Sequence, residues 1–375
     1  MRITGYRSLR TQHQWGRPIG DANGVVGSGI TSVPILLLET DIGITGVGLG
    51  AHEQIDSLFP ALVDADPRAV GTLYDRMLDA LFKSGHQGAS FGTVGTVDTA
   101  LWDLKAKLAE QPLWRLLGAF DRTVPGYASG LDITLDLEQL DQLYSTFAER
   151  GLRTGKLKGG RDPDADAVRL DVISAALERN ARRPGLALDA NESWSPKQAV
   201  RHVAELESKL DLAWVEEPVR RWDAAGLATV SSGVRAAVAS GENLTGLEQY
   251  RQLLAQGALD IVQTGTIYGI THFLRVAAAA HLFSLPVSPV AYHGNALAHA
   301  AAALPNHLAT EVQTLHAPVG LAIDQTVQDG YIVLGDSHGL GVEVDEAALD
   351  PLDRPDRMAG PERRPPDAGL RLSIR

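Results

Sequence analysis

The chain has 375 residues, 44% of them hydrophobic, which is enough for a barrel and a second domain. It contains no cysteine, so disulfides, thiolate catalysis and zinc–thiolate sites are excluded. The net charge of −12 argues against nucleic acid as a partner and gives no general steering toward anionic substrates. Because the N-terminus lacks a signal-peptide pattern and no apolar run is long enough to span a membrane, we expect a cytoplasmic protein with no membrane partner.

The N-terminal third of the chain predicts a small α+β unit. Strand-like patterns over 33–39 and 44–50 are joined by a hairpin-like turn at 41–43. Helical periodicity then follows over 67–82 and again over 93–117.

Short apolar strands alternate with amphipathic stretches from about residue 124 to residue 324. Eight such strands with helices between them indicate an α/β fold, a TIM-like (β/α)8 barrel. The strands contain Tyr127, Lys156, Ala187, Trp214, Val238, Ile261, Val287 and Glu311. We expect a capping domain over 1–122, completed by 328–375, and a catalytic barrel over 123–327.

Three carboxylates lie near strand ends at nearly equal intervals, which are 27 residues from Asp189 to Glu216 and 26 from Glu216 to Glu242. One unit earlier, Lys156 and Lys158 lie on one face of a strand because side chains alternate along it. Residues at the C-terminal ends of barrel strands converge on one pocket. Each residue alone also fits a helix cap or a solvated charge. The shared period favours a three-carboxylate metal site facing a lysine pair.

These motifs, in this order, resemble the enolase superfamily and, within it, the mandelate racemase/muconate lactonizing enzyme branch. The resemblance runs over nearly the whole chain, from TALWDLK at 99–105 through the lysine strand and the three carboxylate motifs. It implies a (β/α)7β barrel, with one helix replaced or missing, under an α+β cap built from the N-terminal region and the C-terminal segment. It also implies that Lys158 is the proton-abstracting base, with Lys156 beside it, and that the magnesium ligands are Asp189, Glu216 and Glu242.

The chemistry of these residue types agrees with that implication. Three oxygen ligands without His or Cys suit Mg²⁺ better than zinc. A magnesium ion can bind a substrate carboxylate and stabilise the enediolate that forms when the α-proton leaves. Lys158 must be neutral to act as the base, and we expect Lys156 and the metal to lower its pKa. Asn191 and Asn243 are candidates for substrate contact or ligand support, although Asn is also a common turn residue.

The opposite wall of the expected pocket departs from the family. Many relatives have a His–Asp dyad there, and Gly265 and Val290 stand at the two positions in this chain. The nearest replacements are Tyr292 and His293, although a histidine in such a loop also fits a structural role. Glu311 matches a family glutamate near the substrate, or is a loop charge.

We therefore expect Mg²⁺-dependent removal of the α-proton from a small-molecule carboxylate through an enediolate. Dehydration of a sugar acid is favoured, because a base stands on one side only and His293 or Tyr292 can serve as the acid for the leaving hydroxyl. A racemase, an epimerase and a lactone cycloisomerase are alternatives within the superfamily. A relative that binds a carbohydrate acid without turning it over is an alternative of another class. The resemblance also implies a homo-oligomer.

Overall fold

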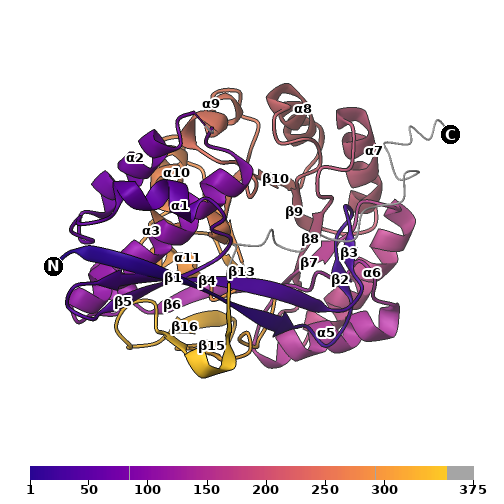
Figure 1. The fold of residues 1–375 in the computed structure, drawn as a ribbon. Helices are drawn as coiled ribbons and strands as arrows, with labels where there is room; N and C mark the ends of the chain where they lie inside the picture. The colour runs from indigo at the N-terminus through magenta and orange to yellow at the C-terminus, as the bar shows by residue number, and fades with distance from the viewer. Residues whose placement is uncertain (84, 292, 353–375) are drawn as a thin grey trace.

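The computed structural model describes residues 1–83, 85–291 and 293–352. Tyr292 and residues 353–375, which include nearly half of the predicted C-terminal completion of the cap, lie outside the described residues. An antiparallel sheet with helices packs beside a barrel of parallel strands (Figure 1). None of the helices in the described ranges is long and apolar enough to cross a membrane.

The antiparallel sheet is built mainly from the N-terminal residues. Its long strands are β1 (Ile3–Gln14), β4 (Ile30–Thr40) and β5 (Thr45–Leu49). The predicted hairpin turn is confirmed, because the Gly43 N–H donates to the Thr40 carbonyl at 3.1 Å and Gly43 has φ +78°. Glycines on β5 let the following long helix approach closely: a Cβ on Gly48 would lie 2.2 Å from the Thr96 carbonyl oxygen.

This part is helical in the two predicted regions, but the helices differ from the prediction in their bounds. They are α1 (Ile55–Leu58), α2 (Val70–Ala80), α3 (Gly88–Leu108) and α4 (Leu113–Leu116), with a 3-10 turn η1 at Phe59–Ala61. The expectation of a single helix over 93–117 is wrong, because α3 ends at Leu108 and α4 begins after Pro112. Proline lacks the N–H that a helix interior needs, so the chain turns there before the helix resumes.

The barrel contains the eight predicted strands. They are β6 (Thr123–Ser129), β7 (Thr154–Lys158), β8 (Gly185–Asp189), β9 (Leu212–Glu216), β10 (Ala237–Ser240), β11 (Ile261–Gly265), β12 (Val287–Val290) and β13 (Thr310–Val312). Strands β6 to β12 pair in sequence and in parallel, and β13 pairs in parallel with β6. The Leu308 N–H donates to the Val287 carbonyl at 2.9 Å, which ties the start of β13 to β12 and closes the barrel.

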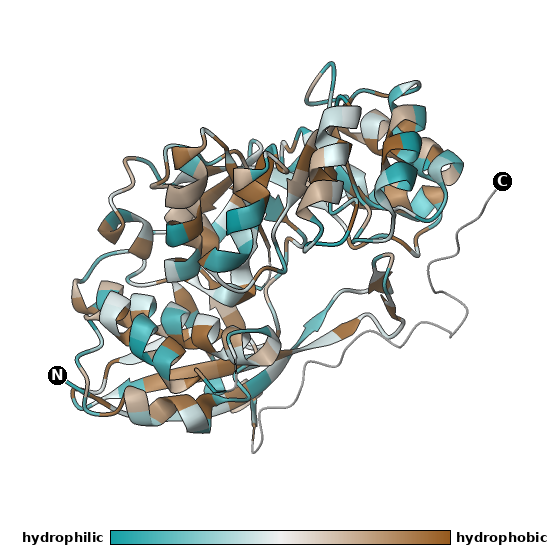
Figure 2. Ribbon diagram, turned by 90° about the horizontal axis from the view of Figure 1, so that it is seen from above, coloured by the Kyte–Doolittle hydropathy of each residue, from teal (hydrophilic) through white to brown (hydrophobic). Residues whose placement is uncertain are grey.

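A helix follows each of the first seven barrel strands. These helices are α5 (Leu137–Glu149), α6 (Pro163–Leu177), α7 (Pro196–Glu207), α8 (Ala224–Gly233), α9 (Leu247–Ala255), α10 (Ile270–Leu282) and the short α11 (Ala296–Ala301), with a 3-10 turn η2 at Thr266–Tyr268. Hydrophobic and hydrophilic residues alternate along them (Figure 2), as expected for helices with one face on a sheet. After β13 the described chain continues as strands without an α-helix, which confirms the (β/α)7β form.

Side-chain alternation along the barrel strands forms the floor of the site. One inward layer is a compact hydrophobic cluster of Tyr127, Ala187, Trp214, Ala239 and Ile261. The next inward position, two residues further along, carries Lys158 beyond Lys156 on β7 and Asp189 beyond Ala187 on β8. The polar groups therefore lie at the C-terminal ends of the strands, above an apolar layer.

The C-terminal segment contacts both parts of the molecule. Its strands are β14 (Leu321–Ile323), β15 (Gln325–Gln328), β16 (Tyr331–Leu334), β17 (Val342–Val344) and β18 (Asp350–Pro351), with a 3-10 turn η3 at Glu346–Ala348. The hairpin of β15 and β16 extends the barrel sheet, because β16 pairs with β6. The return to the N-terminal sheet is made later, where β18 pairs with β1 at Leu9 and Pro351. The domain limits at 122 and 327 remain predictions.

A small hairpin reaches from the N-terminal sheet over the barrel mouth. It consists of β2 (Ile19–Gly20) and β3 (Val25–Val26). In Figure 1 it lies at the far end of β1 and β4, beside β7 and β8. The Asn23 side-chain amide donates to the Asn191 carbonyl at 3.0 Å, which joins the hairpin to the loop after β8. We call residues 16–29 the lid segment.

Candidate active site

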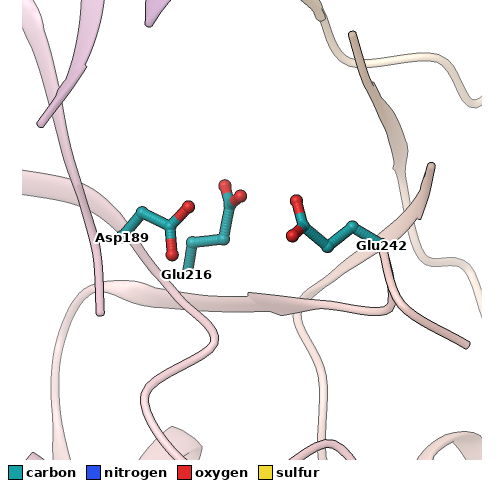
Figure 3. A group of neighbouring side chains, drawn as sticks. All are labelled: Asp189, Glu216 and Glu242. Atoms are coloured by element: carbon teal, nitrogen blue, oxygen red, sulfur yellow. The ribbon is translucent and has the colours of Figure 1, made fainter. Parts of the chain in front are cut away.

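Three carboxylates from neighbouring strands share one space. Asp189 and Glu216 are the last residues of β8 and β9, and Glu242 follows β10 by two positions. One oxygen of each carboxylate lies within 4.8 Å of the others, and the three groups point toward one another (Figure 3). Asp189 and Glu216 are buried, and Glu242 is half-buried. Because all three are hard oxygen donors, the set fits a divalent cation such as Mg²⁺.

Neighbouring polar groups fix the orientation of these carboxylates. The Gln263 side-chain amide on β11 donates to Glu216 Oε2 at 2.8 Å, and the indole N–H of Trp214 lies 3.3 Å from the same oxygen. The Asn191 backbone N–H donates to Asp189 Oδ1 at 2.9 Å. Gln263 was not among the predicted site residues. Its inward position follows from the alternation along β11.

The two lysines lie among the same carboxylates. Lys156 Nζ is 2.5 Å from Glu216 Oε1, 2.9 Å from Glu311 Oε1 and 3.6 Å from Asp189 Oδ2. Lys158 Nζ is 2.5 Å from Asp189 Oδ2. Both lysines are buried. Because both contact Asp189, these ion pairs form one connected cluster near the ends of β7, β8, β9 and β13.

The protein's own groups raise the pKa values of both lysines. Burial lowers the pKa of Lys158, but the surrounding carboxylates, Asp189 first among them, together outweigh it and the net shift is upward. The pKa of Lys156 is also raised, because Glu216 and Glu311 together outweigh its burial. This balance involves the protein's own groups alone, so the expectation that Lys156 and a bound metal together lower the pKa of Lys158 stays a prediction. Repulsion between the lysines is weaker than the pull of the carboxylates within salt-bridge distance.

Three further predicted residues lie around the cluster. Asn191 is buried in the left-handed conformation, with φ +43°, and its Oδ1 has no hydrogen-bond partner among the described residues. The Asn243 amide donates to Glu242 Oε1 at 3.0 Å and to Glu217 Oε1 at 3.1 Å, which favours ligand support over substrate contact. Glu311 Oε2 accepts from the Ala291 N–H at 2.9 Å, and this glutamate is buried within β13 rather than placed in a solvated loop.

The opposite wall has no titratable side chain at the two dyad positions. Gly265 and Val290 are paired in register at the ends of β11 and β12. His293 packs against His13, with ring centroids 4.9 Å apart, and borders a cavity of about 310 Å³ that Trp15 also lines. Burial, and then His13, lower the pKa of His293 to about 3, so its imidazole is neutral at pH 7. Tyr292, the other candidate acid, lies outside the described residues.

A second buried network, which sequence reasoning missed, lies behind the lysine strand. Asp132 follows β6 and accepts hydrogen bonds from the Lys158 backbone N–H at 3.1 Å and from the Tyr144 hydroxyl at 2.8 Å. Arg169 on α6 donates to the Asp132 carbonyl at 2.7 Å. The available signal was the same as for Asp189, namely a carboxylate just after a barrel strand.

Comparison with known proteins places the chain in a family. Residues 9–118 match the model of the mandelate racemase/muconate lactonizing enzyme N-terminal domain, and residues 139–348 match the enolase C-terminal domain-like model. The chain is 30% identical to a 3,6-anhydro-alpha-L-galactonate cycloisomerase of Streptomyces coelicolor, over 87% of this chain and 88% of that protein. It is 29% identical to an L-talarate/galactarate dehydratase of Salmonella typhimurium, over 88% of this chain and 86% of that protein.

The fold is also shared with solved structures. A racemase from Streptomyces coelicolor, solved with bound magnesium, superimposes with a TM-score of 0.84 at 29% identity, over 92% of this chain and 98% of that chain. Since its relatives are named as cycloisomerases, dehydratases and epimerases, the protein is an enzyme of lyase or isomerase type. The chain belongs to the mandelate racemase/muconate lactonizing enzyme branch of the enolase superfamily.

Proposed function

We propose that this enzyme removes the α-proton of a small carboxylate substrate in the presence of Mg²⁺, and that the net reaction is dehydration of a sugar acid. The observation that carries the proposal is the 2.5 Å contact between Lys158 and Asp189 at the edge of the three-carboxylate group. It puts an amine, the only kind of base in the cluster apart from carboxylates, beside the donors suited to a divalent cation. The dehydratase among the relatives supports the reaction class.

In this proposal Asp189, Glu216 and Glu242 hold the magnesium ion. When bound, such an ion neutralises the substrate carboxylate and stabilises the negative charge that develops as the α-proton leaves. The fit rests on the donor set itself, which has three carboxylate oxygens within 4.8 Å of one another and no nitrogen or sulfur.

The lysines divide two tasks in the proposed mechanism. Lys158 receives the α-proton at Nζ, which requires the neutral amine. Its pKa is held up by Asp189, and that attraction weakens when the charge of Asp189 is shared with a cation. Lys156 forms ion pairs with Glu216 and Glu311 and stays protonated. It therefore supplies a fixed positive charge beside the substrate carboxylate. The unpartnered Oδ1 of Asn191 is suited to accept a hydrogen bond from a substrate hydroxyl.

Dehydration is favoured over racemisation because Gly265 and Val290 cannot carry a proton. Racemisation needs a donor on the face opposite Lys158, whereas elimination needs an acid only at the departing β-hydroxyl. We keep His293 as the candidate acid. Since its pKa is about 3, it must take up its proton with the help of an anionic group of the substrate. Lactone cycloisomerisation is the second candidate, and the 30% identity to a cycloisomerase favours it.

The test is a screen of acid sugars for a keto product with MgCl₂, repeated with EDTA and with Lys158→Ala. We expect product only with the metal, and a fall of about 10²–10⁴-fold in the variant, the usual contribution of a general base. Lys209→Ala is the control, because Lys209 pairs with Asp164 on the surface. Binding of acid sugars without a keto product would favour cycloisomerisation over dehydration. Product formed equally well by Lys158→Ala would assign the base to another residue.

A further inference from the structure

We propose that Asp132 is a positioning residue that holds the lysine strand β7 in place. The short segment that contains Asp132 also anchors the lid segment. The inference deepens the proposed function, because it rests on Lys158 being the base. Asp132 touches neither the three carboxylates nor a lysine side chain in any contact described above. It acts on the backbone of β7 at the two lysine residues.

Asp132 accepts a backbone hydrogen bond from β7 at the point where the pairing of β7 with β6 ends. The pairing of β6 with β7 stops at Ser129 and Lys156. Two residues further along β7, the Lys158 N–H donates at 3.1 Å to Asp132 Oδ1 instead of to a backbone carbonyl. A side-chain carboxylate therefore replaces the missing strand at the position of the proposed base.

Two helices complete the clamp around Lys158. Arg169 on α6 lies 3.3 Å from Asp132 Oδ1 with one nitrogen, and with another it donates to the Lys158 carbonyl at 3.2 Å. The Tyr144 hydroxyl on α5 lies 2.8 Å from Asp132 Oδ2 and 2.5 Å from the Lys156 carbonyl. The backbones of both lysine residues are thus connected to one fully buried carboxylate.

The same segment anchors the lid segment on its other side. Gly20 on β2 forms a parallel bridge with Asp132, and its N–H donates to the Leu131 carbonyl at 2.9 Å. Arg17 in addition donates to the Gly130 carbonyl. Residues 130–132 therefore lie between the lid segment and β7, and a shift of the lid segment displaces the group that holds Lys158.

The charge on Asp132 has a specific task in this arrangement. Burying a carboxylate costs free energy that packing alone does not require, and an ionised oxygen accepts stronger hydrogen bonds than a neutral one. Asp132 accepts from Lys158 and Arg169, and the single proton of the Tyr144 hydroxyl is shared between Asp132 and the Lys156 carbonyl. Such outer groups typically change activity about 10–100-fold when they are removed, because small misplacements of a reacting group are expensive.

The experiment compares Asp132→Ala, Asp132→Asn and a matched control, Asp103→Ala. Asp103 is also fully buried and accepts backbone N–H groups from Val47 and Leu340, both at 2.8 Å, but it lies in the N-terminal part. We expect Asp132→Ala to lower kcat about 10–100-fold with a smaller change in KM. Asp132→Asn should recover only part of that loss, because its amide oxygen still accepts from the Lys158 N–H but carries no charge. Asp103→Ala should lower the melting temperature and leave kcat within about 2-fold of the wild type.

A readout that does not depend on turnover is backbone amide exchange followed by mass spectrometry. In Asp132→Ala we expect faster exchange in residues 154–160 and in residues 17–26 together, and in Asp103→Ala in neither. If Asp132→Ala does not fold, Tyr144→Phe tests the same clamp with the loss of one hydroxyl. Unchanged exchange at 154–160, or a kcat equal to that of the control, would overturn the positioning role. If exchange changes as expected but the wild type turns over no acid sugar, the proposed function fails and the clamp stands.

Discussion

Lys156 on the second barrel strand and Glu311 on the last lie 2.9 Å apart, nitrogen to oxygen. Strand β6 lies between β7 and β13, so this ion pair crosses the place where the last barrel strand pairs with the first. The charged groups of the site therefore come from both sides of that junction. Burial raises the pKa of Glu311, but the two lysines outweigh it and the net shift is downward. The carboxylate is therefore ionised at neutral pH and balances a lysine that has no access to water.

Glu311→Gln removes this counter-charge and keeps the shape of the side chain. We expect the free energy of unfolding to fall by about 3 kcal/mol, the lower end of the range for one partner of a buried ion pair, because Glu216 still pairs with Lys156. Urea denaturation measures the change. Glu346→Gln breaks an exposed pair with Arg7 and should cost less than about 1 kcal/mol. Equal effects of the two substitutions would contradict the role of Glu311.

Glu242→Gln tests the metal centre with little disturbance of the lysines, because Asp189 and Glu216 provide their close ion pairs. The wild type should gain thermal stability from MgCl₂, by about 2.7 kcal/mol at a concentration 100 times the dissociation constant. The variant should lose most of this gain. Glu138→Gln on the surface of α5 is the control and should respond to Mg²⁺ like the wild type. A full magnesium response in Glu242→Gln would remove this residue from the ligand set.

Tyr250→Phe and Tyr144→Phe should separate the two halves of the site. The Tyr250 hydroxyl lies 2.9 Å from the carbonyl oxygens of both Gly241 and Gln263, beside Glu242 rather than beside the lysines. We expect Tyr250→Phe to raise the Mg²⁺ concentration needed for half-maximal activity by up to about 10-fold, with a smaller change in kcat. Tyr144→Phe should instead lower kcat, with a smaller change in the Mg²⁺ concentration needed for half-maximal activity. Titration of activity with MgCl₂ at saturating substrate measures both. The same phenotype in both variants would show that the two supports are not independent.

Asp98 gives stability a defined pH dependence. This buried carboxylate on α3 accepts from the Thr271 N–H at 2.7 Å, at the start of α10, and burial raises its pKa from 3.8 to about 6. The folded protein therefore binds this proton more tightly than the unfolded chain. The resulting stability is complete below about pH 4 and is lost as the pH rises through 6.

Asp98→Asn removes that titration. The unfolding free energies of wild type and variant should differ by a constant above about pH 7 and change relative to each other by about 3 kcal/mol in total between about pH 7 and about pH 3. Urea denaturation at a series of pH values measures this difference. Parallel curves across the whole range would show that Asp98 does not titrate in this window.

Periodicity predicted much of the fold and of the candidate site. Alternation along β7 put Lys156 and Lys158 on one face, and the spacing of strand ends brought Asp189, Glu216 and Glu242 to one edge of the barrel. These are rules of backbone geometry, which hold whatever side chains surround them.

The clamp of Asp132 was missed for a different reason. Its partners Tyr144 and Arg169 lie 12 and 37 residues away on two helices, and a helical pattern does not say which residue reaches a strand end. The upward shift of the pKa of Lys158 among the protein's own groups was missed for a similar reason. The sign of that shift depends on which oxygens come within salt-bridge distance, and rotamers decide this.

The pairing of β18 with β1 has a consequence for how the chain reaches its fold. Leu9 and Pro351 are register partners although the whole barrel lies between them in sequence. During synthesis, this part of β1 is therefore an open sheet edge until residues 350–351 have emerged, and open edges favour pairing with other chains. The first strand to be made is thus among the last to be covered, and a chain interrupted within the barrel exposes an edge that the finished protein hides.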